Sequence, residues 1–392
     1  MKVTIEQLRQ WDKESYVCLD IRGQIPYQHG HIEGAVCFGE GDVRNETEHE
    51  QLLKNVNGKK VVVYCSYGEK SKDVVEQLYE KGIEAYNLEG GFRAWLLDNA
   101  VEKKEYSVVY EGQENANEKN VFSRDEILRY DRQMILPQIG MKGQQKLKEG
   151  RVLIVGAGGL GSPAGLYLAG AGVGKIGIID ADEVSLSNLQ RQIIHRSSNV
   201  HENKAISAAR AMRELNDTIE YKVYTDFLTA ENVEEIVAGY DFVIDGADNF
   251  ETKFLINDAC VLLKKAFCHA GILQFQGQLM TYVPKKGPCY RCIFEEIPAP
   301  GSVPNCSQAG VTGALAGIIG SMQALEAVKY LTGAGELLTG KILQFNGLTM
   351  KSRILKFPRG NRSCRVCGEK ADIRSVRENR EEYRRQGYCF FL

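Results

Sequence analysis

The chain has 392 residues, a formal net charge of −2 and a hydrophobic fraction of 43%. This length suggests two or three domains, and the nearly balanced charge gives no basic surface for nucleic acid. The N-terminal sequence MKVTIEQLRQWDKE lacks the apolar core of a signal peptide. The longest apolar stretch, residues 314–331, carries Gln323, Glu326 and Lys329 at helical spacing, so we expect a mostly buried helix and no membrane span.

The cysteine content indicates the compartment. Eleven cysteines is an odd number, and the chain shows no export signal. Such thiols are typical of a reducing compartment, where they serve metal binding or catalysis and not a disulfide framework. We therefore expect a cytoplasmic protein.

The first part of the sequence has the pattern of a small α/β domain. Residues 16–21, 61–64 and 85–88 are predicted strands, and residues 73–78 have helical periodicity. The second strand leads to Cys65 in the loop CSYGEKS, whose amides and following helix N-terminus can hold an anion. Such surroundings lower the pKa of a thiol. We predict that Cys65 carries a persulfide sulfur taken from thiosulfate or from a cysteine desulfurase.

This segment resembles a single rhodanese domain. The motifs DIR, GHIEGA, the seven-residue loop and EGGFRAW match over about residues 4–100. Lys70 stands where that loop often has arginine, so the charge is kept but the planar guanidinium is lost. The alternatives are a structural cysteine at a strand end or an inactive, rhodanese-like binding module.

Residues 101–122 are predicted to be a linker. They contain EGQENANEKN and show no convincing periodicity. A flexible coil of this length spans about 25 Å on average and about 70 Å when stretched. Such a linker would let a persulfide on Cys65 reach a site in the next domain.

A glycine turn follows the first strand of that domain. Residues 152–155 form an apolar run, and after the turn come a small-residue helix and a second apolar run ending at Asp180. The glycines let the backbone approach a phosphate, the helix N-terminus presents N–H groups to it, and the acid can accept ribose hydroxyls. We therefore predict a Rossmann-like, doubly wound α/β fold that binds a nucleotide. The glycines of the turn are Gly156, Gly158, Gly159 and Gly161.

The residues after the acid distinguish between nucleotides. The glycine pattern alone favours a dinucleotide such as NAD, but Arg191 and Lys204 suit a polyphosphate whose charge grows on the leaving group. Asp248, in DGADN after the next apolar strand, suits Mg²⁺ bound together with phosphate oxygens. The alternative is that both cations belong to a solvated face and that Asp248 caps a helix beginning near Glu251.

These motifs together resemble the MoeB/ThiF-type adenylyltransferases, which are bacterial relatives of ubiquitin-activating enzymes. RYDRQ, GAGGLGS, DAD, SNLQRQ, Lys204, DGADN, CYRC, NCSQAGV and CRVC occur in the family's order over about residues 123–370. The resemblance implies ATP-dependent adenylation of the C-terminal glycine of a ubiquitin-like sulfur carrier that ends in Gly-Gly.

The resemblance also implies roles for individual residues. Asp180 would bind the ribose, Arg191 and Lys204 the phosphates, and Asp248 the metal ion. Arg132, in RYDRQ, matches an arginine that in such dimers reaches the ATP of the partner subunit, so we expect a homodimer. The full nucleotide-binding set is predicted to be Gly156, Gly158, Gly159, Gly161, Asp180, Asp182, Asn188, Arg191, Lys204 and Asp248.

Two C-x-x-C pairs are predicted to bind one metal ion. The pairs are Cys289 with Cys292 and Cys364 with Cys367, each beside turn-forming residues. Four thiolates suit tetrahedral zinc and leave no open position, so we expect a structural site. The alternative is two unrelated pairs of reduced cysteines. A redox role is disfavoured because neither pair is expected to open a helix after a strand.

Cys306 and the C-terminal tail complete the sequence. Cys306 lies in the loop PAPGSVPNCSQAGV. In the resembling family this is a cysteine on a mobile crossover loop that can form a thioester or an acyl disulfide with the carrier; the alternative is an inert loop cysteine. In the charged tail, RSVRENREEYRRQ is predicted to form a solvated helix.

The sequence therefore predicts a rhodanese-like domain (1–100), a linker (101–122), an adenylyltransferase domain (123–370) and a tail (371–392). The predicted function is activation of the carrier with ATP and Mg²⁺, followed by sulfur transfer that yields a thiocarboxylate. The rivals are an NAD-dependent oxidoreductase and a non-catalytic scaffold that binds the carrier. The pathway stays open among molybdopterin, thiamine, cysteine and tRNA thiolation, as does whether Cys306 or Cys65 attacks the adenylate.

Overall fold

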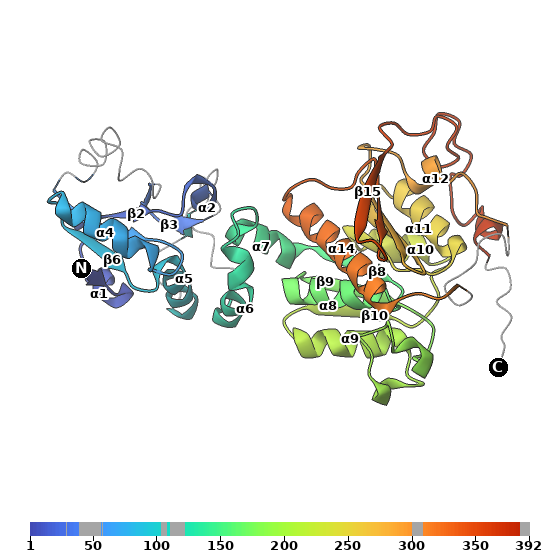
Figure 1. Ribbon diagram of the computed structural model, residues 1–392, viewed down its shortest axis with the longest axis horizontal. Helices are drawn as coiled ribbons and strands as arrows, with labels where there is room; N and C mark the ends of the chain where they lie inside the picture. The colour runs from blue at the N-terminus through green and yellow to red at the C-terminus, as the bar shows by residue number, and fades with distance from the viewer. Residues whose placement is uncertain are drawn as a thin grey trace. The chain divides into compact units, whose positions relative to one another are not determined.

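The computed structural model describes residues 1–28, 30–38, 56, 58–102, 108–109, 122–299 and 309–384, with only the backbone of 99–102 and 108–109. The chain divides into two compact units, Met1–Lys146 and Leu147–Leu392 (Figure 1). Cys306 and most of the predicted linker lie outside the described residues.

The first unit contains a five-stranded parallel sheet with the order β1-β6-β5-β2-β4. The central strand β5 is buried along its apolar run, as expected for a parallel strand covered on both faces. A small antiparallel pair joins β3 to β7. The strands are β1 (Lys2–Val3), β2 (Tyr16–Asp20), β3 (His31–Ile32), β4 (Val36–Cys37), β5 (Lys60–Tyr64), β6 (Ala85–Leu88) and β7 (Val108–Val109). The helices are α1 (Ile5–Arg9), α2 (Gln24–Gln28), α4 (Lys70–Glu80) and α5 (Gly91–Glu102).

Helix α6 (Arg124–Met134) also belongs to the first unit, and α7 (Gly140–Glu149) crosses the boundary between the units. A capping box at Ser123 begins α6. The apolar face of α6, formed by Ile127, Tyr130 and Met134, lies in the same core cluster as Trp95 of α5. The segment that carries RYDRQ therefore packs on the rhodanese-like part of the chain.

The second unit contains an eight-stranded sheet with the order β10-β9-β8-β11-β12-β13-β14-β15. The first five strands of this order are parallel, and the last three are added in antiparallel fashion. The strand order reverses between β8 and β11, which is the switch point where ligands bind in such sheets. The strands are β8 (Arg151–Val155), β9 (Lys175–Ile179), β10 (Glu220–Tyr224), β11 (Phe242–Asp245), β12 (Ala266–Leu273), β13 (Gln276–Tyr282), β14 (Lys341–Asn346) and β15 (Lys351–Lys356).

Helices cover both faces of this sheet. Side chains alternate along β8, so that Val152 and Ile154 enter one core cluster and Leu153 and Val155 enter the other. One face is covered by α8 (Gly161–Ala171), α9 (Lys204–Leu215) and α14 (Gly313–Thr332), and the other by α10 (Val233–Ala238), α11 (Phe250–Leu262) and α12 (Tyr290–Ile293) (Figure 1). The predicted doubly wound α/β fold is confirmed.

Helix α14 is the long apolar segment of the chain, and two of its polar residues, Gln323 and Glu326, are buried. Gln323 donates hydrogen bonds to the carbonyl oxygens of Asp245 and Cys268, at 2.8 and 3.0 Å. The Glu326 carboxylate accepts from Leu338 N–H at 2.9 Å. The prediction of a mostly buried helix is confirmed, and among the described residues no helix has the length and apolar character needed to cross a bilayer.

The described part of the tail does not form the solvated helix that its charge pattern predicts. It contains only a short 3₁₀ turn, Arg380–Tyr383. Tyr383 is 7% exposed, and its hydroxyl donates to the Asp258 carboxylate at 2.8 Å. The prediction is wrong because apolar side chains of the tail pack into the core on the α11 face of the sheet. These side chains are Ile373, Val376 and Tyr383.

Candidate functional site

The loop after β5 surrounds the Cys65 sulfur with hydrogen-bond donors. Cys65 is 5% exposed, and its Sγ accepts from Gly68 N–H at 3.1 Å and from Ser71 Oγ at 3.4 Å. Burial raises the pKa of this thiol, but hydrogen bonds from Ser71 and from the backbone of Tyr67 and Gly68 outweigh it. The pKa of Cys65 is therefore lowered, and the loop favours a thiolate.

The neighbouring DIR motif has a structural role. The Arg22 guanidinium pairs with the Asp20 carboxylate, which also accepts a hydrogen bond from the Tyr64 hydroxyl at 2.9 Å. Arg22 lies 3.8 Å from the ring centroid of Phe92. This buried network fixes the end of β5, from which Cys65 emerges. Lys70 is exposed at the first position of α4.

In the second unit, close backbone approaches shape the glycine turn between β8 and α8. Gly156 has a φ of +94°, and a side chain there would meet the carbonyl oxygen of Gly246 at 2.9 Å. A Cβ at Gly161 would lie 1.9 Å from the Gly156 carbonyl oxygen. A Cβ at Gly159 would lie 3.4 Å from Cγ of Arg191. The turn therefore lies against the loop after β11, at the switch point, with the Arg191 stem beside it.

Asp180 follows β9 and contacts the same turn. Its carboxylate accepts hydrogen bonds from Ala157 N–H at 2.8 Å and from Asp182 N–H at 2.9 Å. Burial raises the pKa of Asp180, and the nearby charge of Lys204 opposes this effect. Each carboxylate oxygen has a further lone pair with which to accept a ligand hydroxyl.

Lys204 is the first residue of α9 and is only 8% exposed. Its Nζ lies 2.9 Å from the exposed Asp182 carboxylate. Asn203 caps α9 and donates to the Asp180 carbonyl oxygen at 2.9 Å, so the start of α9 is held beside the end of β9. A cation at a helix N-terminus opposes the macrodipole, and a bound anion would offset that cost.

Arg191 and Asn188 lie between β9 and α9. Arg191 is half-buried, and its Nη1 donates to the Ser187 carbonyl oxygen at 3.2 Å. The Asn188 side chain accepts from Ser185 N–H at 3.2 Å. Arg191 therefore contacts the glycine turn through its stem, whereas Asn188 supports the local turn.

Asp248 is exposed in the loop after β11. Asn249, and not Asp248, caps α11, because its side-chain oxygen accepts from Thr252 N–H at 2.8 Å. Capping was the alternative role for Asp248, and the neighbouring residue performs it. Since Gly246 approaches Gly156, this loop and the glycine turn meet at the same edge of the sheet.

Sequence reasoning missed the buried residues that support these loops. His195 Nε2 lies 3.0 Å from the Ala157 carbonyl oxygen in the glycine turn, and its Nδ1 lies 2.8 Å from Ser207 Oγ. Burial lowers the pKa of His195. No signal in the sequence could have identified this histidine, because both of its contacts are with distant segments.

A second buried network lies at the end of β11. The Asp245 carboxylate contacts Lys253 Nζ at 3.2 Å and His269 Nδ1 at 2.7 Å. Lys253 also donates to the Ala270 carbonyl oxygen at 2.8 Å. The network ties the first turn of α11, and with it the loop that carries Asp248, to β11 and β12.

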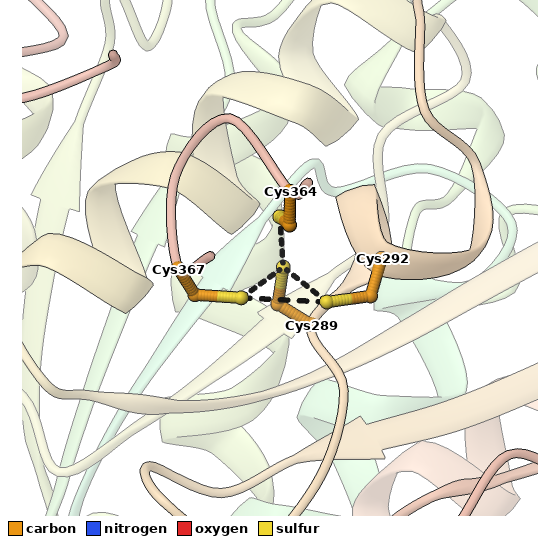
Figure 2. A group of neighbouring side chains, drawn as sticks. All are labelled: Cys289, Cys292, Cys364 and Cys367. Atoms are coloured by element: carbon orange, nitrogen blue, oxygen red, sulfur yellow. Dashed lines mark hydrogen bonds between the residues drawn. The ribbon is translucent and has the colours of Figure 1, made fainter. Parts of the chain in front are cut away.

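Four cysteines of the second unit converge on one point (Figure 2). All four sulfurs lie within 4.8 Å of one another. The Sγ–Sγ distance is 3.6 Å for Cys289 and Cys364, and 3.3 Å for Cys292 and Cys367. Sulfurs bound at about 2.3 Å to one tetrahedral ion lie about 3.8 Å apart. The cluster could hold a metal ion, and the two pairs are not unrelated.

One premise about these pairs is wrong. Cys289 occupies the N-cap position of the four-residue helix α12, so the first pair does open a short helix. Its sulfurs nevertheless face the second pair, which favours metal binding over a redox role. Of the other cysteines in the described residues, Cys18, Cys260 and Cys268 are buried, whereas Cys37 is half-buried. Burial raises the pKa of Cys18 to about 12.

Arg132 lies on α6 in the first unit, whereas the glycine turn lies in the second. Its side chain contacts the loop that carries Cys65, since Nη1 donates to the Tyr67 hydroxyl at 3.0 Å.

Comparison with known proteins identifies both parts of the chain. The model of the ThiF family matches residues 130–366, which is more than half of the chain. The chain belongs to the ThiF family. The model of the rhodanese-like domain matches residues 4–98 of this ThiF-family chain. The predicted family and the N-terminal rhodanese domain are therefore confirmed.

Several curated relatives resemble the ThiF region. The sulfur carrier protein adenylyltransferase of Thermus thermophilus is 44% identical over 260 residues, covering 65% of this chain and 96% of the relative. Adenylyltransferase and sulfurtransferase MOCS3 of Culex quinquefasciatus is 48% identical, covering 64% of this chain and 57% of the relative. The mouse MOCS3 is 44% identical, covering 65% and 56%. This chain spans little more than half the length of the MOCS3 relatives it matches.

Solved structures share the fold. The crystal structure of Escherichia coli MccB is 23% identical with a TM-score of 0.56, and the match covers 67% of this chain and 76% of that chain. The structure of PaaA is 24% identical with a TM-score of 0.54, covering 62% and 77%. At this identity the comparison supports the architecture alone.

Proposed function

We propose that this ThiF-family chain adenylates the C-terminal carboxylate of a small sulfur carrier protein and converts it to a thiocarboxylate with sulfur held on Cys65. One observation carries the proposal: a single chain combines a ThiF glycine turn with a rhodanese loop that favours a thiolate. The names of its relatives, adenylyltransferase and sulfurtransferase, support both halves. Adenylation is assigned to residues 123–370 and sulfur loading to residues 1–100, with residues 101–122 as the linker.

In the first step the carrier carboxylate attacks the α-phosphate of ATP, and the bond from that phosphorus to pyrophosphate breaks, so that pyrophosphate leaves. A carboxylate is a poor electrophile, and the acyl adenylate formed in this step has a good leaving group. Two anions must meet, so cations and a helix N-terminus are needed. The N-terminus of α8, Arg191 and Lys204 would hold the phosphates, and Asp180 would hold the ribose. The ThiF match favours this reaction over hydride transfer with NAD. The nucleotide set is Gly156, Gly158, Gly159, Gly161, Asp180, Asp182, Asn188, Arg191, Lys204 and Asp248.

Mg²⁺ fits the position of Asp248. The carboxylate is exposed, is not used for capping α11 and lies on the loop that meets the glycine turn. Mg²⁺ prefers one or two carboxylates together with phosphate oxygens. When bound, the ion would neutralise charge on the phosphates of ATP.

Zn²⁺ fits the four-cysteine cluster. The sulfur separations suit a tetrahedral ion with four protein ligands and no open position. The ion would clip the segment after β13 to the segment after β15, which is a structural role. Thiolates of this kind require a reducing compartment, so we assign the protein to the cytoplasm.

The partners follow from the same chemistry. The carrier would end in Gly-Gly, as the resemblance to the MoeB/ThiF-type adenylyltransferases implies. The sulfur donor would be thiosulfate or a desulfurase persulfide, since the Cys65 loop stabilises an anionic sulfur. Arg132 would act in the nucleotide site of a second copy, which makes the active form a homodimer. Cys306 or Cys65 would attack the adenylate.

ATP–pyrophosphate exchange tests the adenylation step. The probe is a small carrier protein that ends in Gly-Gly, assayed with ATP and Mg²⁺. Asp248→Ala should lower the exchange rate by about 100-fold or more, because an ion that offsets phosphate charge contributes several kcal/mol. Asp217→Ala, an exposed carboxylate change beside α9, should leave the rate unchanged. Exchange at the wild-type rate in the Asp248 variant would refute the metal assignment. A wild-type chain that binds NAD and gives no exchange would overturn the function.

A further inference from the structure

The loop that carries Cys65 is bonded to the helix that carries Arg132. The Tyr67 hydroxyl, two residues after Cys65, donates to the Asp131 carboxylate at 2.9 Å. The same hydroxyl accepts from Arg132 Nη1 at 3.0 Å. Arg93 Nε lies 3.3 Å from the other oxygen of Asp131. Tyr67 thus joins the loop that carries Cys65 to two consecutive residues of α6.

These contacts are partly withdrawn from water. Asp131 is 8% exposed, and a buried carboxylate requires such partners. Burial raises the pKa of Tyr67, and its hydrogen bond to Asp131 raises it further. The guanidinium groups of Arg132 and Arg93 lie 5.5 and 6.0 Å from the Tyr67 ring centroid. Tyr67 is therefore held by hydrogen bonds at its hydroxyl and by two guanidinium groups near its ring.

Apolar packing holds the same two elements together. Ile127, Tyr130 and Met134 of α6 share a core cluster with Trp95 of α5, and α5 follows directly on the Cys65 loop in space, since Phe92 N–H donates to the Cys65 carbonyl oxygen at 2.9 Å. The loop and α6 therefore belong to one packed body. Within it, Arg132 is hydrogen-bonded to Tyr67, which is two residues after Cys65.

We propose that Cys65 and Arg132 serve the same nucleotide site, with Tyr67 as the positioning residue that links them. In the homodimer, Cys65 of one protomer then delivers sulfur to the adenylate formed by its partner. This inference rests on the proposed function, in which Arg132 acts on the ATP of the second copy. A side chain that enters the partner's site brings with it the loop to which it is bonded.

The transfer step balances as follows. The terminal sulfur of the Cys65 persulfide forms a bond to the carrier's carboxyl carbon, and the bond from that carbon to AMP, or to a thiol that has replaced AMP, breaks with its electron pair on the leaving group. The product is an acyl disulfide with Cys65. A thiol reductant then attacks Cys65 Sγ, and the carrier leaves as a thiocarboxylate with the electron pair of the broken S–S bond. Dithiothreitol serves as that reductant in the assay.

Heterodimers of differently tagged chains test the arrangement. Each pair is purified through both tags and supplied with ATP, Mg²⁺, thiosulfate, dithiothreitol and a small Gly-Gly-ending carrier protein, whose thiocarboxylate is read by mass spectrometry. Cys65→Ala paired with Asp248→Ala should give about half the wild-type rate, because one of the two sites receives an intact Cys65 and Arg132 from its partner. Arg132→Ala paired with Cys65→Ala should give none, because each site lacks one of the two groups.

The opposite result would overturn the inference. If Cys65 acted in its own protomer while Arg132 acted across the interface, the first pair would be inactive and the second would be active. Inactivity of both pairs would mean that both groups act within one chain, which also contradicts the proposal. Failure of the proposed function is distinguishable, because the wild-type dimer would then give no pyrophosphate exchange.

Tyr67→Phe tests the link directly. The variant keeps the ring and loses both hydrogen bonds to α6, so thiocarboxylate formation should fall by about 10-fold through loss of positioning. Loading of Cys65 by thiosulfate should stay within about twofold of wild type, because the substitution keeps the loop backbone that donates to the sulfur. The matched control is Tyr79→Phe, an exposed tyrosine on α4. A wild-type rate of thiocarboxylate formation in Tyr67→Phe would contradict the positioning role.

Discussion

Replacement of Lys253 with methionine isolates the buried charge network behind the Asp248 loop. Lys253 is 7% exposed, and its ammonium group contacts the fully buried Asp245 carboxylate at 3.2 Å. Methionine keeps most of the stem volume but removes the charge. Breaking a buried ion pair by removing one partner costs about 3–5 kcal/mol. We expect a loss of about 3 kcal/mol in the free energy of unfolding at pH 8, at the lower end, because His269 Nδ1 still contacts Asp245.

The size of this loss should depend on pH. Burial lowers the pKa of His269, and the charge of Lys253 lowers it further, while Asp245 opposes both. The ring of Tyr290 also packs against His269, with 4.3 Å between the ring centroids. In the wild type the folded pKa lies below the unfolded value, so acid costs stability. In Lys253→Met the pKa of His269 should rise, so protonation below about pH 6.5 restores a charge partner for Asp245. The difference between the two proteins should therefore shrink from pH 8 to pH 5.5.

Urea unfolding can measure the loss of stability in the second compact unit, which contains Lys253. Both tryptophans of the chain, Trp11 and Trp95, lie in the first unit, so their fluorescence follows that unit alone. Far-UV circular dichroism adds the transition of the second unit, whose midpoint should fall by about 1 M urea in Lys253→Met. Lys351→Met, an exposed change on β15, should alter stability by less than about 0.5 kcal/mol. A loss below about 1 kcal/mol at pH 8, or an equal loss at both pH values, would refute this reasoning.

Two further predictions concern the cysteines. The purified protein should hold about one Zn²⁺ per chain. Cys364→Ser should abolish this zinc content and lower the urea midpoint of the second unit, because metal binding contributes to folding. A metal-free wild type of equal stability would contradict a structural role. Ser71→Ala should raise the pKa of Cys65, because the hydroxyl 3.4 Å from its sulfur helps to lower it, so alkylation of Cys65 by iodoacetamide should require higher pH. Ser66→Ala serves as the control, and identical pH profiles for wild type and Ser71→Ala would show that the hydroxyl does not stabilise the thiolate.

The sequence by itself determined the parts of this protein that depend on neighbouring residues. The strands before Cys65 and before Gly156 follow from short apolar runs. The turns after them follow from residue types that such turns require. The spacing within each C-x-x-C pair also predicted convergence on one metal site. These features could be recognised in advance because the physical constraint and the residues that meet it lie within one segment.

The tertiary structure alone decided which long-range contacts form. Charge patterning in the tail favours a helix, yet burial of Tyr383 against Asp258 replaces it. Two adjacent polar residues could each have capped α11, and the backbone geometry at that point selects Asn249 over Asp248.

The link between the two reactive elements was likewise visible only in the fold. Nothing in the local sequence indicates that Tyr67 contacts Asp131 and Arg132, which lie 64 and 65 positions further along the chain. Hydrophobic periodicity states which face of a helix is buried, but not against which partner. The packing of α6 on α5 supplies that partner, and it brings Arg132 to the loop of Cys65.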